Sequence, residues 1–287
     1  MDNLALDAEL TKLMDQMPSF YKSFRADNTV RQHSYAFNSF CKWCFSHNIV
    51  NIMPFSDVYV AMYLMHLANK GKSVSTLNKA YYDICWTNKV AGVADPCKSD
   101  LVISMKEWTP RSIGRFTIRK EPITPDIIKN IVAIYGKARA DLTHLRIACM
   151  FLIGCAGFLR YSELSNLRRD NLTLYEQYVQ LFLEGSKTDV YREGRDVLIS
   201  KTNSNTCPVN TLLRYLSSAD IMHDSTDFIF RPLSFCKSSG TYILTNGKLS
   251  YTTARETKLF ALEISGLDKK QFGLHSLRSG DNCRSTW

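Results

Sequence analysis

The sequence lacks the hydrophobic segments that membrane insertion or export requires. Its longest apolar run, Ile147–Leu159, is shorter than the roughly 20 residues with which a helix spans a bilayer. Met1–Met17 contains acidic residues and has neither the basic start nor the apolar centre of a signal peptide. Repeats, low-complexity tracts and a dense basic import signal are also missing. These absences predict an intracellular protein without a membrane partner.

Cysteine is present, but its pattern argues against disulfides and metals. The count of nine is odd, and most cysteines stand among apolar residues, which is typical of free thiols in a reducing compartment. The close pair is Cys41 and Cys44, with His47 one turn later. A zinc site would need a fourth ligand and usually a second pair at matching spacing. The sequence therefore predicts buried helix cysteines and no metal.

Acidic residues are too few to balance the basic ones. Lysine and arginine number 36 against 27 aspartates and glutamates, which gives a formal net charge of +9 over 287 residues. Such a surplus favours a polyanionic partner, because neutralised phosphates release their counterions. A basic soluble protein without such a partner stays open as the alternative.

The first third of the chain has a helical pattern throughout. Apolar residues recur at helical spacing in five segments: 6–17, Thr29–His47, Ser56–Gly71, Ser75–Gly92 and a shorter stretch between Pro96 and Pro110. Ser56 and Ser75 are suitable N-caps, and Gly71 and Gly92 are suitable stops. Residues 1–108 are therefore predicted to form a compact helical domain.

Residues 109–121 interrupt this pattern with turn formers and positive charge. Arg111, Arg115, Arg119 and Lys120 stand close to Pro110, Gly114 and Pro122. The mixture is typical of an exposed linker. A solvated linker and a segment that contacts a DNA backbone are equally compatible with this composition.

Residues 122–287 are predicted to form a second domain of mixed α+β type. Thr124-Pro125 is a strong helix start, and apolar periodicity predicts helices over 127–135, 141–157, 208–217 and 251–262. Residues 178–183 and 195–199 alternate as strands on either side of a polar tip, which predicts a hairpin and a small antiparallel sheet. The whole chain is therefore predicted to be mainly α.

Charged and titratable residues form two short pairs of equal spacing. Arg160 and Glu163 are three residues apart, as are His275 and Arg278, so on a helix each pair shares one face. Lys187 lies between the pairs on the predicted hairpin tip. Each feature alone is more typical of structure: a surface ion pair, a turn lysine or a core histidine. Together and in this order they suit a pocket that holds a phosphate group.

The order and local sequence of these residues resemble the tyrosine recombinase, or phage integrase, family. Arg160 follows an apolar helix ending in Ala156-Gly157, and His275 opens a His-x-x-Arg motif that continues into Ser279-Gly280. The resemblance covers nearly the whole chain, because the N-terminal helices are similar to the core-binding, DNA-binding domain of that family. The motif around Cys207-Pro208-Val209 looks closest to recombinases of eukaryotic mobile elements, which implies a nuclear location.

The resemblance implies a role for each residue in breaking and rejoining DNA strands. Arg160 and Arg278 would bind the oxygens of the scissile phosphate, where negative charge develops. Lys187 would protonate the leaving 5′ oxygen, and His275 would assist proton transfer. Glu163 would orient the pocket from behind the arginines. The implied partner is double-stranded DNA, and no metal or cofactor is implied.

The resemblance fails where the nucleophile of the family would stand. In the family a tyrosine follows the second arginine by a few tens of residues, whereas here no tyrosine follows Tyr251. The residues from Asp281 to Trp287 do not match the helix expected there. We therefore expect a C-terminally truncated chain that cannot form the covalent phosphotyrosine link alone. We expect a monomer in the absence of DNA, able to lend its pocket to an intact recombinase protomer in trans.

Three functions stay open at this point. The chain is a recombinase whose activity is lost or incomplete, a non-catalytic DNA-binding module retained from a mobile element, or a protein that uses its helical domain for protein interactions. A type IB topoisomerase would share the pocket chemistry, but the helical N-terminal domain fits a recombinase better.

Overall fold

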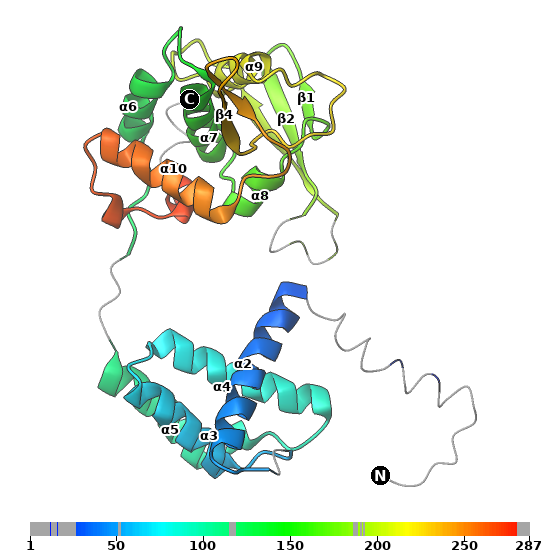
Figure 1. Ribbon diagram of the computed structural model, residues 1–287, viewed down its shortest axis with the longest axis vertical. Coiled ribbons are helices and arrows are strands. Elements are labelled where there is room, and N and C mark those ends of the chain that lie inside the picture. The colour runs from blue at the N-terminus through cyan, green and yellow to red at the C-terminus, as the bar shows by residue number, and fades with distance from the viewer. Residues whose placement is uncertain are drawn as a thin grey trace. The chain divides into compact units, whose positions relative to one another are not determined.

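The computed structural model describes residues 27–50, 53–114, 119–185 and 193–279, together with Lys12, Gln16, Asp189 and Tyr191. The chain divides into two compact units, Met1–Thr117 and Ile118–Trp287 (Figure 1). The helix expected within residues 6–17 lies largely outside the described residues. Among the helices that the structure describes, none has both the length and the apolarity to cross a membrane.

The first unit is built from helices. Its described elements are α2 (Asp27–Ser46), α3 (Asp57–Asn69), α4 (Val74–Ala91), the short 3-10 helix η1 (Pro96–Lys98) and α5 (Asp100–Ile113). The ends of α4 show why the chain folds this way locally: Ser73 Oγ accepts from Thr76 N at 3.2 Å, and Gly92 closes the helix in the left-handed region at φ 67°. Ser75, the predicted cap, lies inside the first turn instead.

Aromatic side chains form much of the core of this unit. Phe40 and Tyr63 are buried, and the ring of Phe40 meets that of Phe55 edge-on at 5.2 Å between centroids. Cys44 is buried among these rings, and burial raises the pKa of its thiol to about 11. Cys44 is therefore a buried helix cysteine, as the sequence predicted, whereas Cys41 on the same helix is only half-buried.

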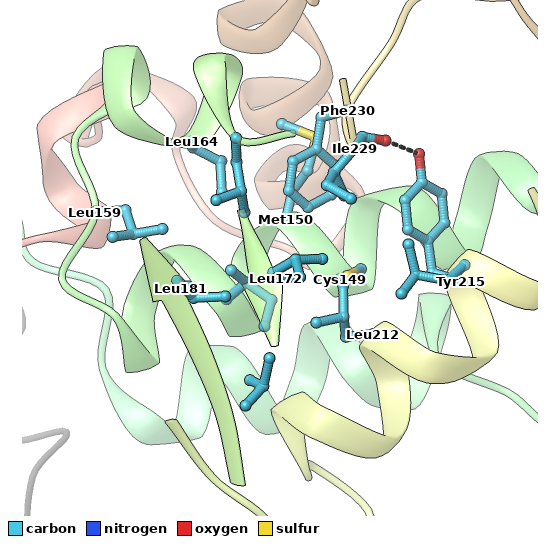
Figure 2. Close-up of a cluster of buried hydrophobic side chains, with 14 of the residues drawn as sticks. Cys149, Met150, Leu159, Leu164, Leu172, Leu181, Leu212, Tyr215, Ile229 and Phe230 are labelled. Carbon is cyan, nitrogen blue, oxygen red and sulfur yellow. Dashed lines mark hydrogen bonds between the residues drawn. The ribbon is translucent and has the colours of Figure 1, made fainter. Parts of the chain in front are cut away.

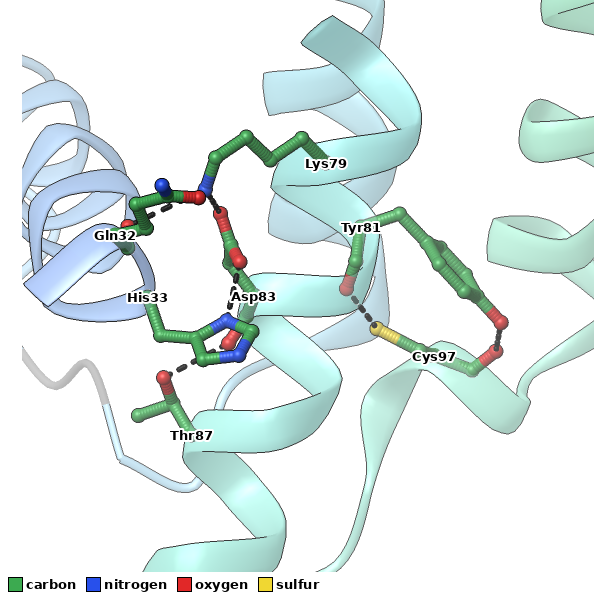
Figure 3. A network of polar contacts seen from close by, with 7 residues as sticks. All are labelled: Gln32, His33, Lys79, Tyr81, Asp83, Thr87 and Cys97. Atoms are coloured by element: carbon green, nitrogen blue, oxygen red, sulfur yellow. Dashed lines mark hydrogen bonds and ion pairs between the residues drawn. The ribbon is translucent and has the colours of Figure 1, made fainter. Parts of the chain in front are cut away.

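A buried carboxylate joins α2 to α4 in the same unit (Figure 3). Asp83 is only 1% exposed, and its two oxygens accept from the ring of His33 and, at 2.6 Å, from Lys79 Nζ. The His33 ring also stacks on Trp86 at 4.5 Å. Because a buried charge is stable only when it is paired, this contact fixes how the two helices pack.

α5 is longer than the sequence predicted. The helix was expected to end before Pro110, but it continues to Ile113 with Pro110 in its last turns. A proline near the C-terminal end removes one backbone hydrogen bond without breaking the helix. Thr109 is buried, and its hydroxyl donates to the Met105 carbonyl at 2.9 Å. Residues 109–113 of the expected linker are therefore helical.

The second unit combines helices with two small antiparallel sheets. Its helices are α6 (Pro125–Tyr135), α7 (Leu142–Ala156), α8 (Tyr161–Asn166), α9 (Pro208–Ser218), α10 (Tyr251–Ile264), η2 (Lys269–Gln271) and η3 (Leu274–Leu277). Its strands are β1 (Leu172–Leu174), β2 (Tyr178–Leu183), β3 (Arg195–Ser200), β4 (Leu233–Cys236) and β5 (Thr241–Leu244). The first sheet has the order β1-β2-β3, and β4 pairs with β5.

α7 is the central helix of this unit. Nearly all its residues are buried, and it packs against α6, α9, α10 and η3. On one side of α7 lies the core shown in Figure 2, where Leu181 of β2 and Tyr215 of α9 meet Cys149 and Met150. The Tyr215 hydroxyl donates to the Ile229 carbonyl at 2.9 Å, so this large buried ring leaves no unpaired oxygen.

The predicted hairpin is confirmed, whereas two other pairings were not predicted. β2 and β3 pair from Tyr178↔Ser200 to Leu183↔Arg195. β1 has three residues, and β4 and β5 are four-residue strands whose side chains are mostly exposed. Short strands without a buried face carry no alternating pattern that sequence analysis can detect.

We predict that the Asp83 contact contributes far more to stability than an exposed ion pair of the same unit. Asp83→Ala removes the buried partner of His33 and of Lys79, whose side chain is 44% exposed and regains water, so the expected loss is about 2 kcal/mol. Glu107→Ala breaks an exposed pair with Arg111 at 3.9 Å and should cost less than about 0.5 kcal/mol. Urea unfolding followed by tryptophan fluorescence measures both losses. Equal losses would contradict the role of Asp83.

Candidate functional site

Arg160 and Glu163 lie where the chain passes from α7 to α8. Phe158 in the left-handed region (φ 49°) and the buried Leu159 turn the chain between the two helices. Arg160 is the N-cap residue of α8, and its backbone N–H donates to Glu163 Oε2 at 2.7 Å. Its Nη1 donates to Glu163 Oε1 at 2.9 Å. One carboxylate therefore caps the helix and holds the arginine side chain.

The Arg160–Glu163 pair is buried. The Glu163 side chain is 1% exposed and the Arg160 side chain 19% exposed. A solvated surface ion pair, the structural alternative raised by the sequence, does not match this burial. A carboxylate so deep in the protein requires positive partners.

Arg195 is a second partner of the same carboxylate, and sequence analysis missed it. It begins β3 opposite Leu183, and its Nη2 lies 3.8 Å from Glu163 Oε1. Its side chain is 47% exposed, so most of its donors remain available. The sequence feature that could have pointed to Arg195 is the glycine directly before it. Gly194 takes a left-handed φ of 72° immediately before β3 begins.

His275 and Arg278 lie in and directly after η3. Leu274 and Leu277 are buried and hold this turn against the core, whereas His275 is exposed. A core histidine, the structural alternative, is therefore wrong. The His275 carbonyl accepts from Arg278 N at 3.0 Å, which fixes the backbone of the pair. Arg278 Nη1 is buried and has no hydrogen-bond partner among the described residues.

An open cleft of about 700 Å³ connects these elements. Arg195, near the middle of the unit's sequence, and Arg278, near its end, both line it. The other walls are the end of α7 with the turn before Arg160, and the first half of β3: Ala156, Gly157, Phe158, Asp196, Val197 and Leu198. Two guanidiniums facing one cleft, one of them with an unpaired buried nitrogen, form a site for an anion with several acceptor oxygens.

A buried lysine holds the turn that carries His275 and Arg278. Lys258 of α10 is 2% exposed, and its Nζ donates to the carbonyl of Gly273 at the start of η3. Burial lowers the pKa of Lys258 to about 7. Cys155 of α7 donates to the Leu277 carbonyl at 3.4 Å, so both ends of the turn are anchored. Sequence analysis missed Lys258, because its helical position carries no motif.

Among the predicted site residues that the structure describes, Arg278 lines this cleft and the others do not. Lys187 and Arg115 lie outside the described residues. Arg111 is on the exposed side of α5 in the first unit. Arg119 and Lys120 are exposed in the second unit, where Lys120 Nζ donates to the Lys270 carbonyl. Backbone bonds from Glu121 N to Gln271 O at 2.7 Å and from Ile123 N to Ser276 O at 2.9 Å place this segment beside η3.

Comparisons with known proteins point to one class. No family model matches the chain. The integrase/recombinase XerD homolog of Selenomonas ruminantium is 27% identical over 260 residues, which cover 89% of this chain and 73% of that protein. The structure of XerH site-specific recombinase bound to palindromic difH substrate matches with a TM-score of 0.55 at 14% identity, over 88% of this chain and 67% of that one. A lambda integrase tetramer bound to a Holliday junction also gives 0.55 at 14% identity, over 94% and 68%.

The mainly helical fold with small antiparallel sheets is that of tyrosine recombinase catalytic domains, as the sequence predicted. The sequence relative and the structural matches support a relationship to the tyrosine recombinase, or integrase, family. Neither the site residues nor the domain boundaries are tested by these similarities, so both stay predictions.

We predict that Lys258 makes the stability of the second unit depend on pH. Burial lowers its pKa from the ordinary 10.5 to about 7 in the folded protein, so between these values the unfolded chain binds the extra proton. Stability should therefore rise with pH from about 7 to 10.5 and fall as pH drops to 7, by up to about 1.4 kcal/mol per pH unit.

Lys258→Met should flatten this dependence, measured as the difference from the parent chain in chemical unfolding at several pH values. Lys269→Met is the matched control, because that lysine is 50% exposed and paired with Glu263. A slope that Lys258→Met leaves unchanged would show that the buried amine is not neutral in the folded protein.

Proposed function

We propose that this chain binds double-stranded DNA and acts in DNA recombination or integration as a tyrosine-recombinase-like protein. The observation that carries the proposal is the cleft lined by Arg195 and Arg278, next to the Arg160 that buried Glu163 holds. A phosphodiester offers the charge and the paired oxygens that such guanidiniums bind. The formal charge of +9 and a sequence relative that is an integrase/recombinase agree with a DNA partner.

In the proposed site the arginines bind the scissile phosphate and stabilise the charge of its transition state. Glu163 is the positioning residue: its two oxygens fix Arg160 through the backbone and the side chain. His275 is exposed beside Arg278, so its imidazole ring is accessible for proton transfer. Lys187 is proposed as the general acid from the family resemblance alone. Cationic side chains supply the electrostatics, so no metal or cofactor is part of this proposal.

The nucleophile is not assigned within the 287 residues. No tyrosine follows the His275–Arg278 turn, and Tyr251 stacks edge-on with Tyr161 at 5.3 Å as part of the α10 start. We therefore propose that this polypeptide binds a DNA phosphate but does not cleave a strand by itself. A tyrosine would come from outside these residues, in cis or from an intact recombinase protomer in trans. A DNA partner locates the proposed activity inside the cell, and in the nucleus if the chain is of eukaryotic mobile-element origin.

A non-catalytic DNA-binding module is the second candidate function. The observation that favours it is the same lack of an assigned nucleophile together with an intact arginine cleft. This module would use the cleft and the exposed cations Arg111, Arg119 and Lys120, with Arg115 of the same segment, to hold the DNA backbone. A role of the helical unit in protein interactions alone has no comparable support from the cleft.

We predict that Arg195 and Arg278 each contribute a phosphate contact. Arg195→Ala and Arg278→Ala should weaken binding to duplex DNA and lower the slope of log K against log salt by about 0.9 for each lost contact. Fluorescence anisotropy of a labelled duplex across salt concentrations measures both effects. Arg160→Ala is unsuitable, because it leaves Glu163 buried without its main partner.

Arg139→Ala is the matched control, because this arginine is exposed between α6 and α7 and outside the cleft. It should leave the slope nearly unchanged. If all three substitutions changed the salt slope equally, the cleft would no longer support the proposal that this chain binds phosphate there.

We also predict that the 287-residue polypeptide forms no covalent adduct with a nicked duplex that traps phosphotyrosine intermediates. Denaturing gels and mass spectrometry of the mixture measure this directly, and Tyr251→Phe serves as the comparison. An adduct that disappears in Tyr251→Phe would assign the nucleophile to this chain and contradict the proposal.

A further inference from the structure

We infer that the helical unit contains a binding site for a zinc-class divalent cation, formed by Cys85, Asp95 and Cys97. One ligand atom from each of these residues lies within 4.8 Å of the other two. The site is independent of the arginine cleft and goes beyond the proposed function. Its spacing along the chain, with one cysteine on α4 and the other two ligands at η1, matches no short zinc motif.

The three side chains converge because local hydrogen bonds hold η1 against α4. Asp95 is the N-cap of η1, and its Oδ1 accepts from Cys97 N at 3.0 Å. The Tyr81 hydroxyl of α4 donates to the Cys97 carbonyl at 3.2 Å, and the Cys97 thiol donates to the Tyr81 carbonyl at 3.8 Å (Figure 3). Besides this cap, a carboxylate oxygen of Asp95 lies within 4.8 Å of both sulfur atoms.

The two cysteines can bind one cation together with Asp95. Both sulfur atoms and one carboxylate oxygen lie within 4.8 Å of one another, so a single ion can contact all three. Thiolates are the species that bind metals, and metal binding releases the thiol protons to solvent.

The donor set selects the class of cation. Two thiolates and one carboxylate are suitable for Zn²⁺, which binds sulfur at about 2.3 Å and carboxylate oxygen at about 2.0–2.2 Å in tetrahedral geometry. Mg²⁺ and Ca²⁺ prefer oxygen ligands throughout and do not fit this set. Cys97 is 1% exposed, whereas Cys85 and Asp95 are half-buried, so a water molecule can complete the fourth position from the solvent side.

A cation at this position would cross-link the helical unit. Cys85 lies on the same helix as the buried Asp83, and Cys97 packs in the aromatic core with Val102 of α5. The chain passes from α4 to α5 through the short η1 turn. A ligand that binds only the folded state raises the free energy of unfolding by mass action. The site would therefore stabilise the packing of α4 against η1 and α5.

The test uses the full 287-residue chain, reduced and freed of metal, with Co²⁺ as the spectroscopic probe and Zn²⁺ as the competitor. We expect one equivalent of Co²⁺ to give an intense sulfur-to-cobalt charge-transfer band, which Zn²⁺ then removes. Zn²⁺ should also raise the melting temperature of the transition followed by tryptophan fluorescence. Cys85→Ser should abolish the band.

Asp95→Asn keeps an oxygen that can cap η1 and removes the carboxylate charge, so the fold is retained and Co²⁺ binds more weakly. Cys41→Ser is the matched control: Cys41 is half-buried on α2 and outside the cluster, so the band should stay. Circular dichroism of each variant confirms folding. The inference is overturned if the parent chain gives no band or if Cys41→Ser removes it.

Discussion

Glu163 is a carboxylate held almost wholly out of water, and its charge has to be balanced where it stands. Arg160 provides two of the bonds it accepts, and Arg195 approaches the same oxygen from β3 at 3.8 Å. Removing the main partner of a buried charge costs several kcal/mol, so Arg160 is required for stability, whereas the more distant and half-exposed Arg195 contributes less. The carboxylate also restrains Arg160 before any ligand arrives. Side-chain entropy that would oppose phosphate binding is therefore lost on folding instead.

α7 brings the segments before Arg160 and before Arg278 together at one cleft. Its C-terminal end leads into the turn before Arg160, and its side packs against η3, which precedes Arg278. Gly154 permits that packing, because a Cβ there would lie 3.1 Å from Leu277 Cδ1. Segments separated by more than a hundred residues thus meet on one apolar helix. A change in the core of α7 would shift the guanidiniums relative to one another without touching either of them.

Sequence analysis succeeded where a single segment carries the signal. The helices over 127–135 and 141–157 and the β2–β3 hairpin have clear periodicity, and the Arg160 and His275 motifs are local. It failed where partners come together across the fold. Arg195 belongs to the site because it approaches Glu163, and Lys258 because it donates a hydrogen bond to the Gly273 carbonyl. Cys85 and Cys97 are in contact because η1 folds back on α4, which no spacing rule describes.

Lys258 and Arg278 have different roles around η3. Burial lowers the pKa of Lys258 to about 7, so near neutral pH its amine carries only part of a charge. A neutral amine still donates a hydrogen bond to Gly273, and that is all its position requires. A phosphate needs a charge that persists despite burial, and guanidinium, unlike ammonium, keeps its proton in proteins. The formal charge of +9 counts both residue types equally. The guanidiniums that line the cleft are nevertheless those of Arg195 and Arg278, and Glu163 holds Arg160 close to Arg195.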